Sequence, residues 1–330
     1  MFQQKIANGR FTLAWAILIA LLAWLFHYVS LVIQSPYSPP SREGLASALS
    51  SAERGMGLGF LTSILAVYFI AELNNAFALL RISSRMLSST LIILLAAAPM
   101  LHTLQMAHLL LICNILAYFN LFATYQRPAA TTHTFLIYFL LATAALAFPQ
   151  LIITLPVWWV SQFILQSLNF RSWIASIIGI VTPSWLIATI AYSTDQLPKL
   201  LAHLNDGWQP QPLHFNTWTI AHYAIVTLSL AIFIIATIDL ILKAHLDKTR
   251  TRHFYQVIIV NAIATFILLI LYPQHIQLIL PLCLIHTAMT GGHFVALSYG
   301  KLQNIIVILF LILLLLLPLL SFTQDPPPFG

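Results

Sequence analysis

Charged residues are scarce in this chain, and acidic residues are scarcer than basic ones. Only 7% of the 330 residues are charged, with 8 Asp and Glu against 14 Lys and Arg. Soluble globular proteins carry about 25% charged residues, so this chain cannot build an ordinary water-exposed surface. Because 60% of its residues are hydrophobic, we expect lipid to be its main solvent.

Cysteine is almost absent as well. Cys113 and Cys283 both lie inside apolar stretches, which argues against a disulfide framework. The sequence also lacks Cys/His zinc spacing, a Gly-rich phosphate loop and a Gly-x-Ser-x-Gly motif. These absences remove the zinc, nucleotide and serine-hydrolase sites that such motifs would indicate.

Histidine is the one common metal ligand that is frequent here, with 12 copies. His286 and His293 are seven residues apart, so they are predicted to share one face of a helix. His102 and His108 lie on either side of a predicted turn. Neither pair has a carboxylate or a cysteine at ligand spacing, so we predict no resident metal or haem.

Long apolar runs fill most of the chain. Runs of about 20 apolar residues predict membrane-spanning helices, and the clear ones are 11–33, 57–80, 106–125, 173–193, 218–242 and 303–321. The run 11–33 is longer than the core of a signal peptide and lacks a small-residue cleavage site, so it is predicted to be retained. Three blocks are too long for one crossing and are broken by Pro99, Pro149 and Pro273, namely 87–125, 134–168 and 254–296. Proline disrupts a helix, so each block is predicted to be a helical hairpin.

The basic residues order these segments across the membrane. The positive-inside rule places the flanking basic residues in the cytoplasm, so each block must cross an even number of times. This gives about eleven spans, an N-terminus inside and a C-terminus outside, in one transmembrane domain, 1–330. The cytoplasmic residues are then Lys5, Arg10, Arg81, Arg85, Arg127, Arg171, Lys243, Lys248, Arg250, Arg252 and Lys301, and the external ones are Arg42, Arg54 and Lys199. A nine-span alternative keeps one hairpin re-entrant or interfacial. The scattered basic residues do not indicate a nucleic-acid surface.

Two external loops are long, 34–56 and 194–217. In the first, Ser41 can cap a short helix whose apolar face predicts a position in the outer interface. In the second, Pro198, Pro210 and Pro212 limit regular structure. External acidic residues could act as a base or hold a metal near a lipid-linked phosphate, or they could simply be solvated.

Two acidic residues fall inside predicted spans. Asp239 is four residues before Lys243, so the two are predicted to pair on one helix. Glu72 lies deeper, and its alternatives are an ion relay, a hydrogen-bonded node with Asn75, or an ion pair with Arg81.

A set of polar and aromatic markers is spread over residues 55–200, namely Glu72 to Asn75, Arg171 to Trp173, Gly179, Pro183 to Trp185 and Tyr192 to Leu197. With these markers the segment resembles an uncharacterised family of multi-pass membrane proteins from the Bacteroidetes. This resemblance implies a bacterial inner-membrane location and no established activity.

The loop positions are also similar to those of C-type glycosyltransferases, which use polyprenyl-phosphate sugars at the outer leaflet. The resemblance implies a lipid-linked sugar as substrate, with membrane lipids around it, and leaves a divalent metal ion open as cofactor. Glu43 or Glu53 would be the general base, and the substrate would be bound by Arg54, Asp195, Lys199, Asp206 and His214. The family's first-loop acid is typically Asp, whereas this chain offers only Glu. The alternative is a non-enzymatic membrane subunit of a transport, secretion or envelope-assembly complex, with a membrane-protein partner.

Overall fold

The computed structural model describes residues 9, 11–34, 42–208, 215, 218–297 and 300–318. Every regular element in these residues is helical. The α-helices are α2 (Thr12–Gln34), α3 (Arg42–Phe77), α4 (Met86–Ala96), α5 (Met106–Ala123), α6 (Thr131–Ala147), α7 (Leu155–Ile164), α8 (Phe170–Ser193), α9 (Leu197–Trp208), α10 (Ile220–Leu242), α11 (Thr249–Leu271), α12 (Ile276–Leu297) and α13 (Lys301–Leu316). Short 3₁₀ helices are η1 (Pro99–Leu101), η2 (Pro149–Thr154), η3 (Ala244–Leu246) and η4 (Pro273–His275).

The helices have the length and composition of a multi-pass membrane protein. Within the described residues, 7 helical segments are long and apolar enough to cross a membrane, in α2, α3, α5, α8, α10, α11 and α12. The helices α4, α6 and α13 are apolar but shorter. An all-helical membrane architecture is therefore confirmed.

Prolines divide the three long apolar blocks as predicted. Pro99, Pro149 and Pro273 each begin a 3₁₀ turn, and these turns separate α4 from α5, α6 from α7, and α11 from α12. Proline suits the first position of a turn because its missing amide hydrogen is not needed there. Each block consequently contains two helices joined by a tight connection.

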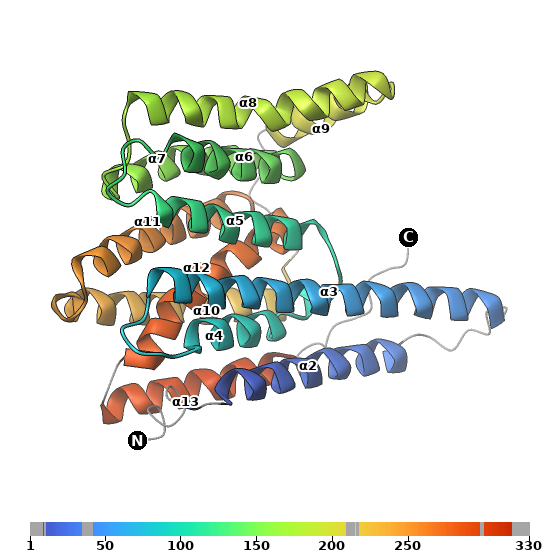
Figure 1. Cartoon of the computed structure of the whole chain (residues 1–330). Coiled ribbons are helices and arrows are strands. Elements are labelled where there is room, and N and C mark those ends of the chain that lie inside the picture. Colours follow the sequence, from blue (N-terminus) through green and yellow to red (C-terminus); the bar gives the residue numbers. More distant parts are fainter. Residues whose placement is uncertain are drawn as a thin grey trace.

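Consecutive long helices pass back and forth, so that they lie side by side in a stack (Figure 1). The stack runs from α8 and α9 through α6, α5 and α11 to α2 and α13 (Figure 1). Helix α12 lies in the interior, where it packs against α4, α5, α10 and α11, and its residues are almost entirely buried.

Small residues let the neighbours of α12 approach closely. A Cβ added to Gly292 would lie 2.8 Å from the Leu87 Cα, and one added to Gly291 would lie 3.0 Å from Ile232 Cγ2. Close backbone approach at small residues is typical of helix packing in membranes. The Gly-Gly pair therefore serves packing between α12 and its neighbours α4 and α10.

Both long loops differ from prediction. The first was expected to hold a separate helix in the outer interface, but Arg42–Phe77 is one continuous helix of 36 residues. Its beginning extends past the neighbouring helices (Figure 1). The second loop was expected to be largely irregular, yet Leu197–Trp208 forms α9. Pro198 is tolerated because it lies in the first turn of that helix.

The basic residues gather at one end of the stack, where the connections after α3, α5, α7, α10 and α12 lie (Figure 1). Hydrogen bonds join these connections, because the Gln126 amide donates to the Leu165 carbonyl and the Asn169 side chain donates to the Pro128 carbonyl. The described basic residues in or beside them are Arg81, Arg85, Arg127, Arg171, Lys243, Lys248, Arg250, Arg252 and Lys301. We call this the basic end.

Candidate functional site

The predicted catalytic carboxylates lie in the first part of α3. Glu43, Glu53 and Arg54 belong to this helix, and their side chains fall outside the described part of the chain. His214 also lies outside the described residues. The structure therefore gives these residues a helical context at most, and their roles stay predictions.

The other predicted substrate-binding residues are exposed around α9. Asp195 occupies the turn after α8 with a positive φ of 54°, while Lys199 and Asp206 lie on α9 itself. Helix α9 packs against α8 and η2, whereas α3 packs mainly against α4 and α5. In the described residues these two regions do not form a shared cluster of side chains.

Helix α9 is nevertheless attached to the bundle. The His203 imidazole lies 3.2 Å from the Leu146 carbonyl, and a Cβ on Gly207 would approach the Pro149 ring to 2.7 Å. These contacts fix α9 on the connection between α6 and α7.

His286 serves the interior of the bundle. Its Nε2 lies 2.8 Å from the Tyr118 hydroxyl, and its Nδ1 lies 3.3 Å from the Thr265 hydroxyl. Within the described residues, no three His, Cys, Asp or Glu side chains form a metal-binding group. A buried imidazole whose two nitrogens both meet hydroxyls is a structural hydrogen-bond centre.

The two intramembrane acidic residues have different partners. Asp239 pairs with Lys243 one turn later, which confirms the predicted ion pair. Glu72 is exposed, and its Oε2 accepts a 3.4 Å hydrogen bond from the Asn75 amide. Of the alternatives for Glu72, the hydrogen bond with Asn75 is present, whereas Arg81 pairs with Asp247.

The end of α3 positions Arg81. Asn74 accepts a hydrogen bond of 3.0 Å from the Leu80 amide and donates one of 3.2 Å to the Ser84 carbonyl. Ala78 has a positive φ of 50°, which turns the chain sharply after the helix. The connection is thereby folded back on its own helix, with Arg81 at its middle.

Arg81 ties this connection to the one between α10 and α11. Its Nε lies 3.2 Å from Asp247 Oδ1, and its Nη1 donates to the Leu246 carbonyl at 3.3 Å. The Asp247 side chain is only 3% exposed, whereas that of Arg81 is 34% exposed. The carboxylate therefore lies behind the guanidinium, which faces outward.

A histidine from α12 reaches the same carboxylate. His293 Nε2 lies 3.3 Å from Asp247 Oδ2, an ion-pair distance when the imidazole is protonated. Burial raises the pKa of Asp247, but His293, Arg81 and Arg252 together outweigh it and hold this pKa below its ordinary value. Asp247 is therefore a carboxylate at neutral pH and joins three segments of the basic end.

A hollow of about 360 Å³ opens beside these pairs, and Arg81, Ile82, Lys243, Leu246 and Leu297 line it. We call it the Arg81–Lys243 hollow. The Lys243 side chain is 28% exposed while that of Asp239 is 13% exposed, so here too the cation is nearer to solvent than its partner. Each of these two cations therefore lies beside a less exposed carboxylate, and both line the hollow.

Aromatic contacts stiffen this end of the molecule. The Arg250 guanidinium lies 5.7 Å from the Phe77 ring centroid and 5.2 Å from that of Phe254. Tyr255 packs edge-on against the His293 ring with centroids 4.6 Å apart. These cation–π and ring contacts hold the first turn of α11 against α3 and α12.

Sequence reasoning missed Asp247 and His293 as neighbours. The only signal was an acidic residue among Lys243, Lys248 and Arg250 in a short connection. Counting basic residues for topology hid it, because that count ignores acids. No local sequence pattern indicated that His293 of α12 would reach Asp247.

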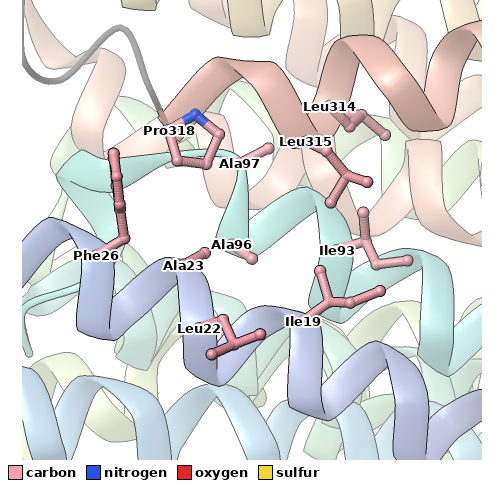
Figure 2. Close-up of a pocket in the computed structure, with 10 residues that line it drawn as sticks. All are labelled: Ile19, Leu22, Ala23, Phe26, Ile93, Ala96, Ala97, Leu314, Leu315 and Pro318. Atoms are coloured by element: carbon pink, nitrogen blue, oxygen red, sulfur yellow. The ribbon is translucent and has the colours of Figure 1, made fainter.

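A second hollow, of about 320 Å³, lies between α2, α4 and α13. Figure 2 shows its lining, which includes Ile19, Leu22, Phe26, Ile93 and Leu315. None of its lining residues is charged or polar, so it could accommodate an apolar chain but has no polar side chain to bind or to react with one.

No protein-family model, curated protein or solved structure matches the chain. Function is therefore inferred from the residues and their geometry.

Proposed function

We propose that the chain is a multi-pass protein of the bacterial inner membrane that binds the phosphate of an anionic lipid in the Arg81–Lys243 hollow. It acts there as a non-enzymatic membrane subunit of a transport, secretion or envelope-assembly complex. The observation that carries the proposal is that both cations lining the hollow face outward while their carboxylates lie behind them.

The basic end supports a cytoplasmic position for this hollow. Lys and Arg are concentrated at the cytoplasmic ends of membrane helices, and the described basic residues concentrate at one end of this stack. In the proposed topology the chain crosses eleven times, with the N-terminus inside. The hollow then opens into the inner leaflet at headgroup level.

Apolar residues beside the hollow favour a lipid over a free anion. Leu242 and Ile241 of α10 are largely exposed just before Lys243, and Leu246 is exposed within the lining. The headgroup phosphate of a lipid can contact the cations while the acyl chains of the same lipid cover these apolar side chains. Basic pockets between helix ends on the cytoplasmic side bind anionic headgroups in this way.

Native mass spectrometry of the purified chain tests the proposal with phosphatidylglycerol as probe. Each basic residue near a membrane surface contributes about 1 kcal/mol to binding an anionic lipid, so Lys243→Gln is expected to weaken binding about fivefold. Arg127→Gln is the matched control, because Arg127 is at the same end but does not line the hollow. Equal losses in both variants would contradict a specific site.

Two further probes identify the source of the phosphate. Phosphatidylcholine is expected to bind more weakly than phosphatidylglycerol, because its headgroup has no net charge. Inorganic phosphate at the same concentration is expected not to displace the lipid. Displacement by inorganic phosphate would instead make the site one for a soluble anion.

A glycosyltransferase acting on a polyprenyl-phosphate sugar is a second candidate. The beginning of α3 and helix α9 both lie at the end opposite the basic end, as that activity at the outer leaflet requires (Figure 1). Glu43 or Glu53 would then be the general base, and Arg54 or Lys199 would neutralise the polyprenyl phosphate that leaves. The chemistry is tested by Glu43→Gln and Glu53→Gln, singly and together, in an assay of envelope-glycan transfer. Unchanged transfer in the double variant rejects this candidate.

A further inference from the structure

The outward face of α3 carries a seam that ends in two polar residues. Its exposed residues recur at spacings of three and four over nearly five turns, and they are Leu58, Leu61, Leu65, Tyr68, Glu72 and Asn75. The opposite face, with Val67, Ile70 and Leu73, is buried against the bundle. Spacings that alternate between three and four are those of a seam along which two helices pack.

Two polar residues at the inner end of this seam need an explanation. Glu72 is six residues past the middle of the span Gly55–Phe77, which is about 9 Å along the helix axis. The half-thickness of the hydrocarbon layer is about 15 Å, so the carboxylate lies at hydrocarbon depth. Charged residues at this depth almost always face a protein interior or a partner.

The described part of the chain supplies no cation to this carboxylate. Glu72 accepts a hydrogen bond from the Asn75 amide on its own helix, and both residues are exposed. Other lipid-facing surfaces need no such partner, because α8 presents apolar residues such as Ile178, Val181 and Trp185. The seam on α3 is therefore an incomplete surface.

We propose that a second copy of this chain docks on the α3 seam, parallel to the first and related to it by a two-fold axis along the membrane normal. Copies inserted by the same charge asymmetry share one orientation, so each seam residue meets its counterpart at the same depth. The Asn75 amide of each chain, which donates one N–H to Glu72 of its own helix, can then donate its second N–H to Glu72 of the second copy, so that amide donors lie between the two carboxylates. Polar side chains that hydrogen-bond between helices drive association inside membranes.

Site-directed cross-linking of the full-length chain in native membrane vesicles tests this interface. Leu61→Cys and Leu65→Cys place thiols on the seam, and Ile178→Cys on α8 is a control with similar lipid exposure. Cys113 and Cys283 are both buried and free, so the background reaction is expected to be low. Mild oxidation is expected to link the two seam variants into dimers of this chain and to leave the α8 variant monomeric.

The outcomes separate the second copy from other occupants. Monomers from both seam variants, or equal dimer from Ile178→Cys, overturn the proposal. Linkage of Leu65→Cys to a protein of another mass also overturns it, and assigns the seam to a different partner. Dimers found only with the seam variants support it.

Variants at Glu72 test the polar contact itself. Each is combined with Leu65→Cys, so that cross-linking reports dimer formation. Glu72→Leu removes two symmetry-related contacts, each worth about threefold on average, so it is expected to lower the cross-linked fraction by up to about tenfold. Glu72→Gln keeps a hydrogen-bonding side chain and is expected to retain most of the dimer. A cross-linked fraction unchanged by Glu72→Leu, in protein with unaltered thermal unfolding, would remove Glu72 from the interface.

Discussion

Asp247 shows how one residue joins three segments of the basic end. Its carboxylate meets Arg81 before α4 and His293 of α12, and its own connection precedes α11. These partners keep its pKa below the ordinary value although burial opposes them. A buried carboxylate paired with a guanidinium is costly to neutralise, because removing its charge leaves Arg81 without a counter-charge.

Asp247→Asn is therefore expected to lower the free energy of unfolding by about 1–3 kcal/mol at neutral pH. A carboxyl group whose pKa is lower in the folded state stabilises the folded state at pH values above its pKa in the unfolded chain, which is about 3.9. That contribution is lost as the pH falls through the folded-state value. Thermal unfolding in detergent between pH 7 and pH 3 should show the variant and the parent converging in acid. A constant difference across this range would contradict the role given to the charge.

Two buried tyrosines provide a matched test of the interior polar network. The Tyr118 hydroxyl lies 2.8 Å from His286 Nε2, whereas the Tyr138 hydroxyl has no partner among the described residues. Tyr118→Phe should cost about 0.6 kcal/mol, the average for hydrogen bonds inside membrane proteins, and at most about 1.7 kcal/mol. Tyr138→Phe should be neutral or slightly stabilising, because it removes an unsatisfied hydroxyl. Chemical unfolding of both variants in one detergent decides between these outcomes, and equal losses would contradict the network.

At the scale of elements, α12 determines how closely the helices pack. Its buried polar and small residues face four other helices, so its environment is protein on all sides. Peripheral helices such as α8 instead present large apolar side chains outward. This contrast is expected when lipid is the solvent, because an apolar exterior then costs nothing.

Gly292→Ala tests this packing. The new methyl group would lie 2.8 Å from the Leu87 Cα, a backbone atom that cannot rotate away. Overpacking of this kind costs about 1–3 kcal/mol, which should appear as a lower unfolding temperature. Gly57→Ala is the matched control, since nothing lies within 4 Å of its added methyl. Because alanine has the higher helix propensity, Gly57→Ala is expected to be neutral or slightly stabilising, and a loss there as large as that in Gly292→Ala would contradict the packing argument.

Sequence patterns predicted where the helices begin and end better than which helices contact one another. Pro99, Pro149 and Pro273 divided the apolar blocks because proline acts locally, on its own turn. The pair of Asp239 and Lys243 was predictable for the same reason, since both lie on one helix. The approach of Arg81 to Asp247 spans a sequence separation that no local pattern encodes. The continuous α3 was missed because prolines and serines before it favoured a separate interfacial helix.

At the scale of the whole molecule, the two ends of the stack differ in charge. Nine of the described basic residues lie in or beside the connections at one end, whereas Arg42 and Arg54 of α3 and Lys199 of α9 lie toward the other. The proposed lipid site, the parallel pairing along α3 and the second candidate activity all depend on which end faces the cytoplasm. A membrane potential and anionic inner-leaflet lipids both favour the basic end inside.

The most direct test is thiol labelling of intact cells with a membrane-impermeant maleimide. Ala129→Cys places a thiol in the exposed connection after α5 at the basic end, and Gln196→Cys places one in the exposed turn before α9. The account predicts that Gln196→Cys reacts in intact cells and that Ala129→Cys reacts only after permeabilisation. Labelling of both from the same side, or of Ala129→Cys alone from outside, would contradict it.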